Sequence, residues 1–146
     1  MAAEERGGFH AYGNMTALCV EPALNKLQTT HTVNFDLAPM GDRGGADWSR
    51  KITVQPDKGE LALIAATLLG YRPDIKLARP DKHLLIARQP NQLYMTGGPA
   101  RKLALPLGPA EAFQLSTVIM HCMTKNYPFV DSQTIVAMLR GSCTYK

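Results

Sequence analysis

One strand–turn–helix pattern occurs twice in this chain, at a spacing of 51 residues. Residues 51–70 read KITVQPDKGELALIAATLLG, and residues 102–121 read KLALPLGPAEAFQLSTVIMH. Each copy begins at a lysine, continues as a short apolar strand, turns at proline or glycine and runs into an apolar helix. A glutamate, Glu60 or Glu111, stands three residues after each turn. Self-similarity at a fixed period indicates that one supersecondary unit is repeated.

The match extends upstream of these stretches without a gap. HTVNFDLAP at residues 31–39 falls on KHLLIARQP at residues 82–90, so one strand-like segment falls on another. The pattern therefore predicts that residues 31–70 and 82–121 are equivalent halves of the fold. The alternative is that unrelated strand–turn–helix segments look alike when only their patterns are compared.

Short antiparallel strands are predicted between turn signals. Residues 31–39 alternate apolar and polar side chains, which is typical of a half-buried strand. Glycine, proline and asparagine separate the other apolar segments, and the glycine-rich stretch 41–47 is predicted to be a hairpin loop. The predicted strands span residues 11–20, 31–39, 48–54, 75–79, 83–88, 92–96 and 102–105.

Three helices are predicted from their end signals. Asp57 can cap the first helix, Glu60 can complete a capping box, and Gly70 is a natural stop. Gly108-Pro109 can open the second helix, which runs to about residue 126, because proline fits the first helical turn. Asp131 can cap a third, short helix that ends near residue 140.

The order of these elements predicts an α+β fold. We expect two pseudo-symmetric antiparallel β-meander-plus-helix units and a short C-terminal helix, all in a single domain of residues 1–146. The internal repeat takes up about residues 11–70 and 72–126. Residues 1–9 are expected to be a loose N-terminal tail, and residues 127–146 a C-terminal helical extension.

Composition indicates a globular cytoplasmic protein. No apolar run approaches the roughly 18 residues that a membrane span needs, and the first residues show no basic and apolar segments of a signal peptide. The three cysteines, Cys19, Cys122 and Cys143, are odd in number and lack CxxC spacing. Reduced thiols in the cytoplasm are the simpler interpretation.

Basic residues are concentrated in the middle of the chain. The formal net charge is +4, but residues 48–102 hold ten lysines and arginines against four acidic residues. Such an excess favours an anionic partner, although a basic face is often no more than a solvated surface.

Cations and aromatic rings alternate in the same region. Proteins that bind single-stranded nucleic acid need a basic groove along the phosphates and aromatic faces on which bases stack. Trp48 and Tyr94 could instead pack in the core or at a subunit interface. The predicted nucleic-acid-binding residues are Trp48, Arg50, Lys51, Lys76, Arg79, Lys82, Arg88, Tyr94, Arg101 and Lys102.

The tandem of strand-meander-plus-helix units on a small basic chain resembles the Whirly family of single-stranded-DNA-binding proteins. It is broadly similar to the superfamily that also holds the Pur proteins and transcriptional coactivators with a curved DNA-binding sheet. The resemblance is one of architecture over about residues 11–126, and the family's lysine-rich KGKAAL-type strand is absent. It implies sheets whose helices cross one another, with single-stranded DNA along exposed strand edges and faces.

No pattern for catalysis, a metal or a cofactor is found. His121-Cys122 lies in the apolar run VIMHCM, where a free cysteine behaves as a small hydrophobe. Asp57, Glu60 and Glu111 are expected at helix starts, where acidic residues favour the helix dipole. We therefore expect no catalytic residues, no metal and no cofactor.

Two functions of different classes follow. The first is binding of single-stranded nucleic acid, with DNA favoured over RNA, on a basic sheet bearing aromatic residues and without catalysis. The second is a non-catalytic interaction or assembly subunit. Open strand edges and the wide apolar surface of the helix at 109–126 lead us to expect a homo-oligomer in either case, and a small enzyme is the remaining class.

Overall fold

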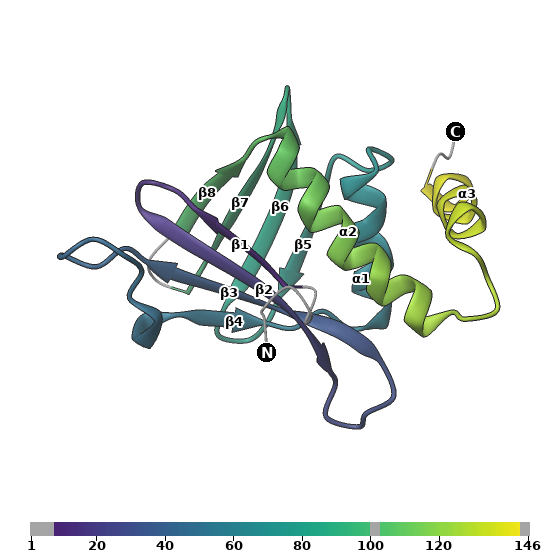
Figure 1. Ribbon diagram of the computed structural model, residues 1–146, viewed down its shortest axis with the longest axis horizontal. Coiled ribbons are helices and arrows are strands. Elements are labelled where there is room, and N and C mark those ends of the chain that lie inside the picture. Colours follow the sequence, from purple (N-terminus) through teal and green to yellow (C-terminus); the bar gives the residue numbers. More distant parts are fainter. Residues whose placement is uncertain (1–7, 100–102, 144–146) are drawn as a thin grey trace.

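The computed structural model describes residues 8–99 and 103–143, which form two four-stranded antiparallel sheets and three α-helices. The first sheet has the strand order β1-β2-β3-β4 and the second has β5-β6-β7-β8. Their strands run in clearly different directions, and the helices lie together on one side (Figure 1). The strands of the first sheet are β1 (Phe9–Tyr12), β2 (Thr16–Leu24), β3 (His31–Pro39) and β4 (Ile52–Val54). Those of the second are β5 (Asp74–Ala78), β6 (His83–Gln89), β7 (Gln92–Gly98) and β8 (Leu103–Leu107).

Each sheet is followed by a helix that packs across onto the other sheet. Helix α1 (Lys58–Leu68) follows the first sheet and contacts β5 and β6, whereas α2 (Pro109–Asn126) follows the second sheet and contacts β1, β2 and β3. Helix α3 (Ser132–Cys143) packs against both of them. The fold is therefore the predicted α+β arrangement of two similar units with a short C-terminal helix. None of the helices in the described ranges is long and apolar enough to span a membrane.

The 51-residue register holds for only part of each unit. It places β4 on β8 and α1 on α2, as the structure does. It also places residues 31–39 on 82–90, which is wrong, because these segments are the third strand of one sheet and the second strand of the other. The connection between β3 and β4 is much longer than that between β7 and β8, so a comparison without gaps slips by one strand.

The predicted strand at residues 11–20 is a hairpin of two strands. The chain bends at Asn14 and Met15, and β2 continues through Pro22 to Leu24 opposite β3. The expected loose tail is also wrong at its end, because Phe9 is a buried residue of β1 that pairs with Val20. Residues 1–7 of that tail lie outside the described residues.

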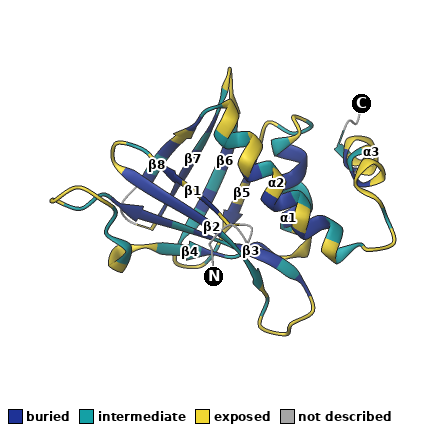
Figure 2. Ribbon diagram, in the orientation of Figure 1, coloured by how far each residue is buried: buried dark blue, intermediate teal, exposed yellow. Residues whose placement is uncertain are grey.

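The predicted strand at residues 48–54 begins later than expected. Trp48–Arg50 forms a short 3-10 helix, η2, because the Asp47 carboxylate accepts a hydrogen bond from the Ser49 backbone N–H at 3.2 Å. Only residues 52–54 pair with β3. Figure 2 shows that the connections on either side of β3 are exposed while the strand is mostly buried.

The two sheets come into direct contact at Gly97 of β7. A Cβ atom at this position would lie 2.7 Å from Leu37 Cδ1, 3.2 Å from Ile52 Cδ1 and 3.2 Å from the His83 carbonyl oxygen. Leu37 is fully buried, so its side chain has little room to move. Only glycine lets β7 approach the first sheet so closely.

The first helix is held at its start by an ion pair as well as by the predicted capping box. Asp57 and Glu60 exchange the two capping hydrogen bonds. The Arg79 guanidinium donates to both oxygens of the Glu60 carboxylate, at 2.8 and 3.0 Å, and to the Gln55 carbonyl oxygen at 2.8 Å. These bonds from Arg79 hold the pKa of Glu60 below its usual value, and the Asp57 backbone acts in the same direction while burial opposes it.

We predict that replacing Arg79 with methionine lowers the free energy of unfolding near pH 7 by about 1–3 kcal/mol, the usual range for hydrogen bonds to charged groups. The pKa of Glu60 is lower in the folded protein than in the unfolded chain. The ion pair therefore stabilises the fold fully above the pKa that Glu60 has in the unfolded chain, and this stabilisation is lost as the pH falls through the pKa of Glu60 in the folded protein. Urea unfolding should therefore show that the variant and the wild type differ less in free energy of unfolding near pH 3 than near pH 7. Arg43→Met, on the exposed β3–β4 connection, is the control, and an equal difference at both pH values would contradict the ion-pair account.

Candidate nucleic-acid interface

The β1–β2 turn of the first sheet meets the second sheet at one end of the molecule. Residues of both sheets line a cleft of about 590 Å³ there. The first sheet contributes the turn between β1 and β2 and the end of β3. The second contributes the outer face of β7 and β8. The lining residues are Tyr12, Gly13, Asn14, Met15, Thr16, Pro39, Met40, Tyr94, Leu103, Ala104 and Pro106.

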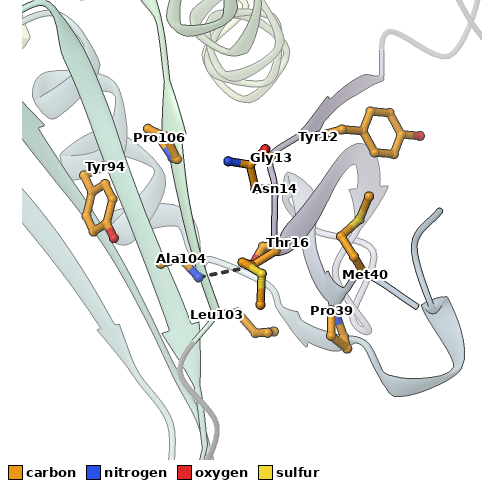
Figure 3. A pocket seen from close by; sticks show the side chains of 11 residues that line it. Tyr12, Gly13, Asn14, Thr16, Pro39, Met40, Tyr94, Leu103, Ala104 and Pro106 are labelled. Atoms are coloured by element: carbon orange, nitrogen blue, oxygen red, sulfur yellow. Dashed lines mark hydrogen bonds between the residues drawn. The ribbon is translucent and has the colours of Figure 1, made fainter. Parts of the chain in front are cut away.

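The β1–β2 turn is fixed by a tight approach to the second sheet. The Gly13 N–H donates to the Thr16 carbonyl oxygen at 2.8 Å, and a Cβ atom on Gly13 would lie 2.6 Å from Leu105 Cδ1. The Thr16 hydroxyl oxygen accepts a hydrogen bond from the Ala104 N–H at 3.2 Å, drawn as a dashed line in Figure 3. The inner end of the cleft is thus a direct link between the two sheets.

The facing walls of the cleft carry ring and thioether side chains, and Asn14 and Thr16 are polar residues of the lining. In Figure 3, Tyr94 and Pro106 lie on one side, and Pro39 and Met40 lie on the other. Among the described residues that line it, none carries a formal charge. A planar ring entering this space would meet a tyrosine face, proline rings and a thioether, all of which are good surfaces for stacking and van der Waals contact.

The turn at the mouth of the cleft exposes two large side chains. Met15 is 76% exposed and Tyr12 is 59% exposed. Tyr12 points away from Tyr94 in Figure 3, and its ring stacks on His10 with ring centroids 6.4 Å apart. Single exposed hydrophobic residues are common, but two of them beside a cleft extend its apolar surface outward.

The segment that carries Trp48 is attached beside the same cleft. The Pro39 carbonyl oxygen accepts a hydrogen bond from the Asp47 N–H at 2.9 Å. Asp47 caps η2, so Trp48 and Arg50 follow directly from this attachment. Trp48 is half-buried and Arg50 is exposed.

Two of the predicted cations have acidic partners that leave them accessible. Lys51 Nζ lies 3.4 Å from Asp36 Oδ2, and Arg50 Nη1 lies 3.9 Å from Asp47 Oδ2. About half of each basic side chain is exposed, at 46% for Lys51 and 52% for Arg50. Exposed ion pairs of this kind are weak, so an anionic ligand can compete with the carboxylates.

The other predicted residues are dispersed. Lys76 lies on the outer face of the second sheet, the same face as Tyr94, with β6 between them. Lys82 is half-buried in the β5–β6 turn. Arg101 and Lys102 directly precede Leu103 in the sequence and lie outside the described residues.

Two predicted arginines have structural partners within the chain. Arg79 is bound to Glu60 at the start of α1. Arg88 lies near the other end of that helix and donates to the carbonyl oxygens of Thr67 and Leu68, each at 3.3 Å. Residues two apart along a strand point to the same face, so Arg88 shares a face of β6 with the buried residues Leu84 and Ile86. This is the face that the helices cover.

The outer edge of β8 has its donors occupied between residues 104 and 108. Ala104 donates to Thr16, Pro106 has no N–H, and the Gly108 N–H donates to the Glu111 carboxylate at 3.2 Å. Residues 104, 106 and 108 share one edge because N–H groups alternate sides along a strand. Pairing of a further strand along this part of the edge, one of the routes to oligomers expected from the meander, therefore lacks free donors.

Two of the three thiols, those of Cys19 and Cys122, are poorly suited to catalysis. Burial, together with Glu21 and Asp36, raises the pKa of Cys19 to about 11. Burial also raises the pKa of Cys122, whose Sγ–H donates to the Thr32 carbonyl oxygen at 3.4 Å. Both thiols are therefore protonated near neutral pH, and the thiolate is the reactive form. Within the described residues, no group of three or more histidine, cysteine or acidic side chains could hold a metal ion.

The first-sheet half of the cleft was not predicted from the sequence. Gly13-Asn14 is a turn signal within the segment predicted to be one strand. Recognising that turn would have placed Tyr12 and Met15 at a hairpin tip. Pro39 and Met40 had no signal of their own, because their role depends on contact between two sheets.

The arrangement of the two sheets and their crossing helices is that of a Whirly-like protein. Similar solved structures include the plant transcriptional regulator PBF-2, with a TM-score of 0.63 and 21% identity, covering 84% of this chain and 82% of that one. WHY3 from Arabidopsis thaliana has a TM-score of 0.61 and 18% identity, covering 90% of this chain and 96% of that one. A guideRNA-binding protein complex bound to a gRNA has a TM-score of 0.64 and 13% identity, covering 84% and 92%.

Comparisons of the sequence with protein-family models and with curated proteins gave no match. At identities this low, structural likeness establishes the fold alone. The ligand therefore has to be argued from the residues of this chain.

Proposed function

We propose that the protein binds single-stranded nucleic acid at the cleft between its two sheets, without catalysing a reaction. The observation that supports the proposal is the hydrogen bond from the Asp47 N–H to the carbonyl oxygen of Pro39, because Pro39 lines the cleft with Tyr94 and Asp47 leads directly into Trp48, Arg50 and Lys51. Stacking surface and accessible positive charge therefore occur at the same end of the molecule. Arg101 and Lys102, which precede Leu103 in the sequence, are proposed as further phosphate contacts.

The apolar character of the cleft favours a single strand over a duplex. Stacking of a base on an aromatic side chain contributes about 1–3 kcal/mol and requires an unpaired base. The bases would enter between Tyr94 and Met40, and the phosphates would follow Arg50 and Lys51. Lys76, on the same outer face as Tyr94, extends this path across the second sheet.

The similar structures support a nucleic acid as the ligand class. One of them is a guideRNA-binding complex bound to its RNA, and another is a transcriptional regulator. The walls of the cleft are apolar and would accept either sugar. We favour single-stranded DNA, in keeping with the architectural resemblance to the Whirly family.

Fluorescence anisotropy with matched DNA oligonucleotides, single-stranded and duplex, and with the RNA of the same sequence tests the proposal. The single strands should bind more tightly than the duplex. Binding should weaken with salt at a log–log slope of about −0.7 for each phosphate contacted, hence roughly −3 if Arg50, Lys51, Arg101 and Lys102 each contact one. Absence of single-strand binding at low salt would reject the function and leave the assembly role.

A second candidate, an assembly subunit, is favoured by exposed hydrophobic residues on the helical side. Phe113 of α2 is 68% exposed, Met138 of α3 is 56% exposed, and Phe129 between these helices is 98% exposed. Large side chains left in water on neighbouring elements are typical of interaction surfaces. A homo-oligomer would cover them and leave the cleft at the sheet ends free.

We predict that light scattering at micromolar concentration reports at least a dimer. Replacing Phe113 and Met138 together with serine should shift the protein toward the monomer while its circular dichroism is unchanged, because both side chains are exposed. A monomeric wild-type protein would contradict self-association. It would leave the nucleic-acid proposal standing, since the cleft belongs to one chain.

A further inference from the structure

The last turn of α2 is fastened to the first residues of β3 by two side chains. Asn126 bonds both backbone groups of His31, accepting from its N–H at 2.7 Å and donating to its carbonyl oxygen at 2.8 Å. Cys122 donates to the carbonyl oxygen of Thr32. Figure 1 shows this end of α2 next to the hairpin of β2 and β3. The position of His31 relative to the helix is thereby set, although 95 residues separate it from Asn126.

A pocket of about 270 Å³ lies at this junction. Its ionisable side chains are His31 from β3 and His121, Lys125 and the buried thiol of Cys122 from α2. Burial raises the pKa of that thiol, so it is neutral. The remaining lining residues are Pro22, Ala23, Leu24 and Thr32.

The charge that this pocket can acquire from its lining is positive. Of the described residues that line it, none is acidic. Glu21 precedes the lining residue Pro22 in β2, so its side chain points to the opposite face of the sheet, and it does not line the pocket. His121 and Lys125 are one helical turn apart, so their side chains share a face of α2. Three nitrogen-bearing residues from two elements therefore line one small pocket, with His31 half-buried and His121 and Lys125 exposed.

We propose that His31, His121 and Lys125 form a site for a tetrahedral oxyanion, namely a phosphate group. An ammonium and two imidazolium groups supply charge-assisted hydrogen bonds, which are the interactions that phosphate oxygens accept most strongly. Histidine gains its positive charge as the pH falls through about 6.5. Protonation of an imidazole adds a second N–H donor and a positive charge, so we expect the pocket to bind an oxyanion more tightly near pH 6 than near pH 8.

This site does not depend on the proposed function, because it lies at the opposite end of β2 and β3 from the cleft. Thr16 and Pro39 mark the cleft end of the two strands, and Leu24 and His31 mark the pocket end. The phosphate group could belong to a free small molecule or to the end of a nucleic-acid strand. The experiment separates these sources.

Proton NMR of the imidazole signals during a titration with sulfate tests the site on the wild-type protein. Sulfate keeps its charge between about pH 6 and pH 8, so any pH dependence comes from the protein. Sulfate should shift the signals of His31 and His121 near pH 6 and much less near pH 8, and inorganic phosphate should shift the same signals near pH 6. The signals of His10 and His83, which lie on other strands, are internal controls and should not move.

Variants then test the three side chains. His31→Gln with His121→Gln should weaken sulfate binding near pH 6 by about tenfold or more and remove its pH dependence. Lys125→Gln should weaken binding at both pH values, and Lys26→Gln on the exposed β2–β3 turn should have no effect. A 5′-phosphorylated oligonucleotide that shifts His31 and His121, when its unphosphorylated form does not, identifies a strand end as the source. Shifts with the inorganic ions alone identify a small phosphate ligand.

Two results would overturn the inference. Sulfate and phosphate that leave both histidine signals unmoved near pH 6 would show that the pocket takes no oxyanion. Equal shifts of all four histidines would show general ion binding rather than a site.

Discussion

Replacing Gly97 with alanine is expected to lower the free energy of unfolding by about 1–3 kcal/mol, the usual cost of overpacking a core. The added methyl group would lie 2.7 Å from Leu37 Cδ1 and 3.2 Å from the His83 carbonyl oxygen. Leu37 is fully buried and the oxygen belongs to a paired strand, so neither moves without cost. The two sheets would have to separate where β7 meets the first sheet.

Chemical denaturation of Gly97→Ala beside Gly141→Ala measures this effect. Gly141 lies in α3, where an added Cβ atom would meet nothing within 4 Å beyond the helix backbone around it, so alanine there should be neutral or stabilising by up to about 1 kcal/mol. Leu37→Val shortens the side chain that conflicts with the added methyl group and should make the double variant less unstable than the sum of the two single changes. Unchanged stability of Gly97→Ala would contradict the close packing of the sheets.

Replacing Tyr94 with alanine is expected to weaken single-strand binding by about 1–3 kcal/mol, roughly five- to 150-fold. The ring of Tyr94 lies across the cleft from Pro39 and Met40, so its removal takes away a stacking surface without removing a charge. The salt dependence of binding should therefore stay as it is in the wild type. Tyr94→Phe keeps the ring and should retain most of the affinity.

Phe129→Ala is the matched control for Tyr94→Ala. Phe129 is an aromatic residue that is 98% exposed and lies between α2 and α3, away from the cleft. Its loss should leave nucleic-acid binding unchanged. Equal effects of the two alanine variants would show that the cleft is not where bases stack, and a lowered stability of Tyr94→Ala in denaturation would assign Tyr94 a structural role instead.

Local signals in the sequence were sufficient to predict the helices and the strands of the second sheet. The capping box at Asp57, the glycine at position 70, which has a positive φ of 89°, and the proline at the start of α2 all act within one turn of chain. The turns that divide residues 74–107 are likewise short. Such features depend on neighbouring residues, and the predicted elements agree with the structure there.

The first sheet was harder to predict because its features depend on distant residues. Phe9 is buried through its pairing with Val20 and through the core beneath it, which its polar surroundings in the sequence do not indicate. Trp48 lies in a turn because of Asp47, whereas its apolar character suggested a strand. The strand register was misplaced because the β3–β4 connection is long.

The sequence alone could not indicate which of the proposed binding residues lie together, for a similar reason. Trp48, Arg50, Lys51 and Tyr94 were selected for residue type, and the structure brings the Trp48–Lys51 segment to the end of the sheets where Tyr94 lines the cleft. Arg79 and Arg88 were selected as cations in the same way, but each forms hydrogen bonds with α1. These bonds join residues far apart in the sequence, so no local pattern predicts them. Pro39 and Met40 line the cleft through packing between the sheets.

Mapping of backbone amide signals by NMR, with a short single-stranded oligonucleotide added to the protein, tests the proposed interface most directly. The signals of Asn14, Met15, Met40, Trp48 and Tyr94 should shift or broaden together, at one binding constant. Signals of the exposed surfaces of α2 and α3 should stay in place. Shifts confined to those helices, or no shifts at low salt, would contradict the cleft as a site for single-stranded nucleic acid.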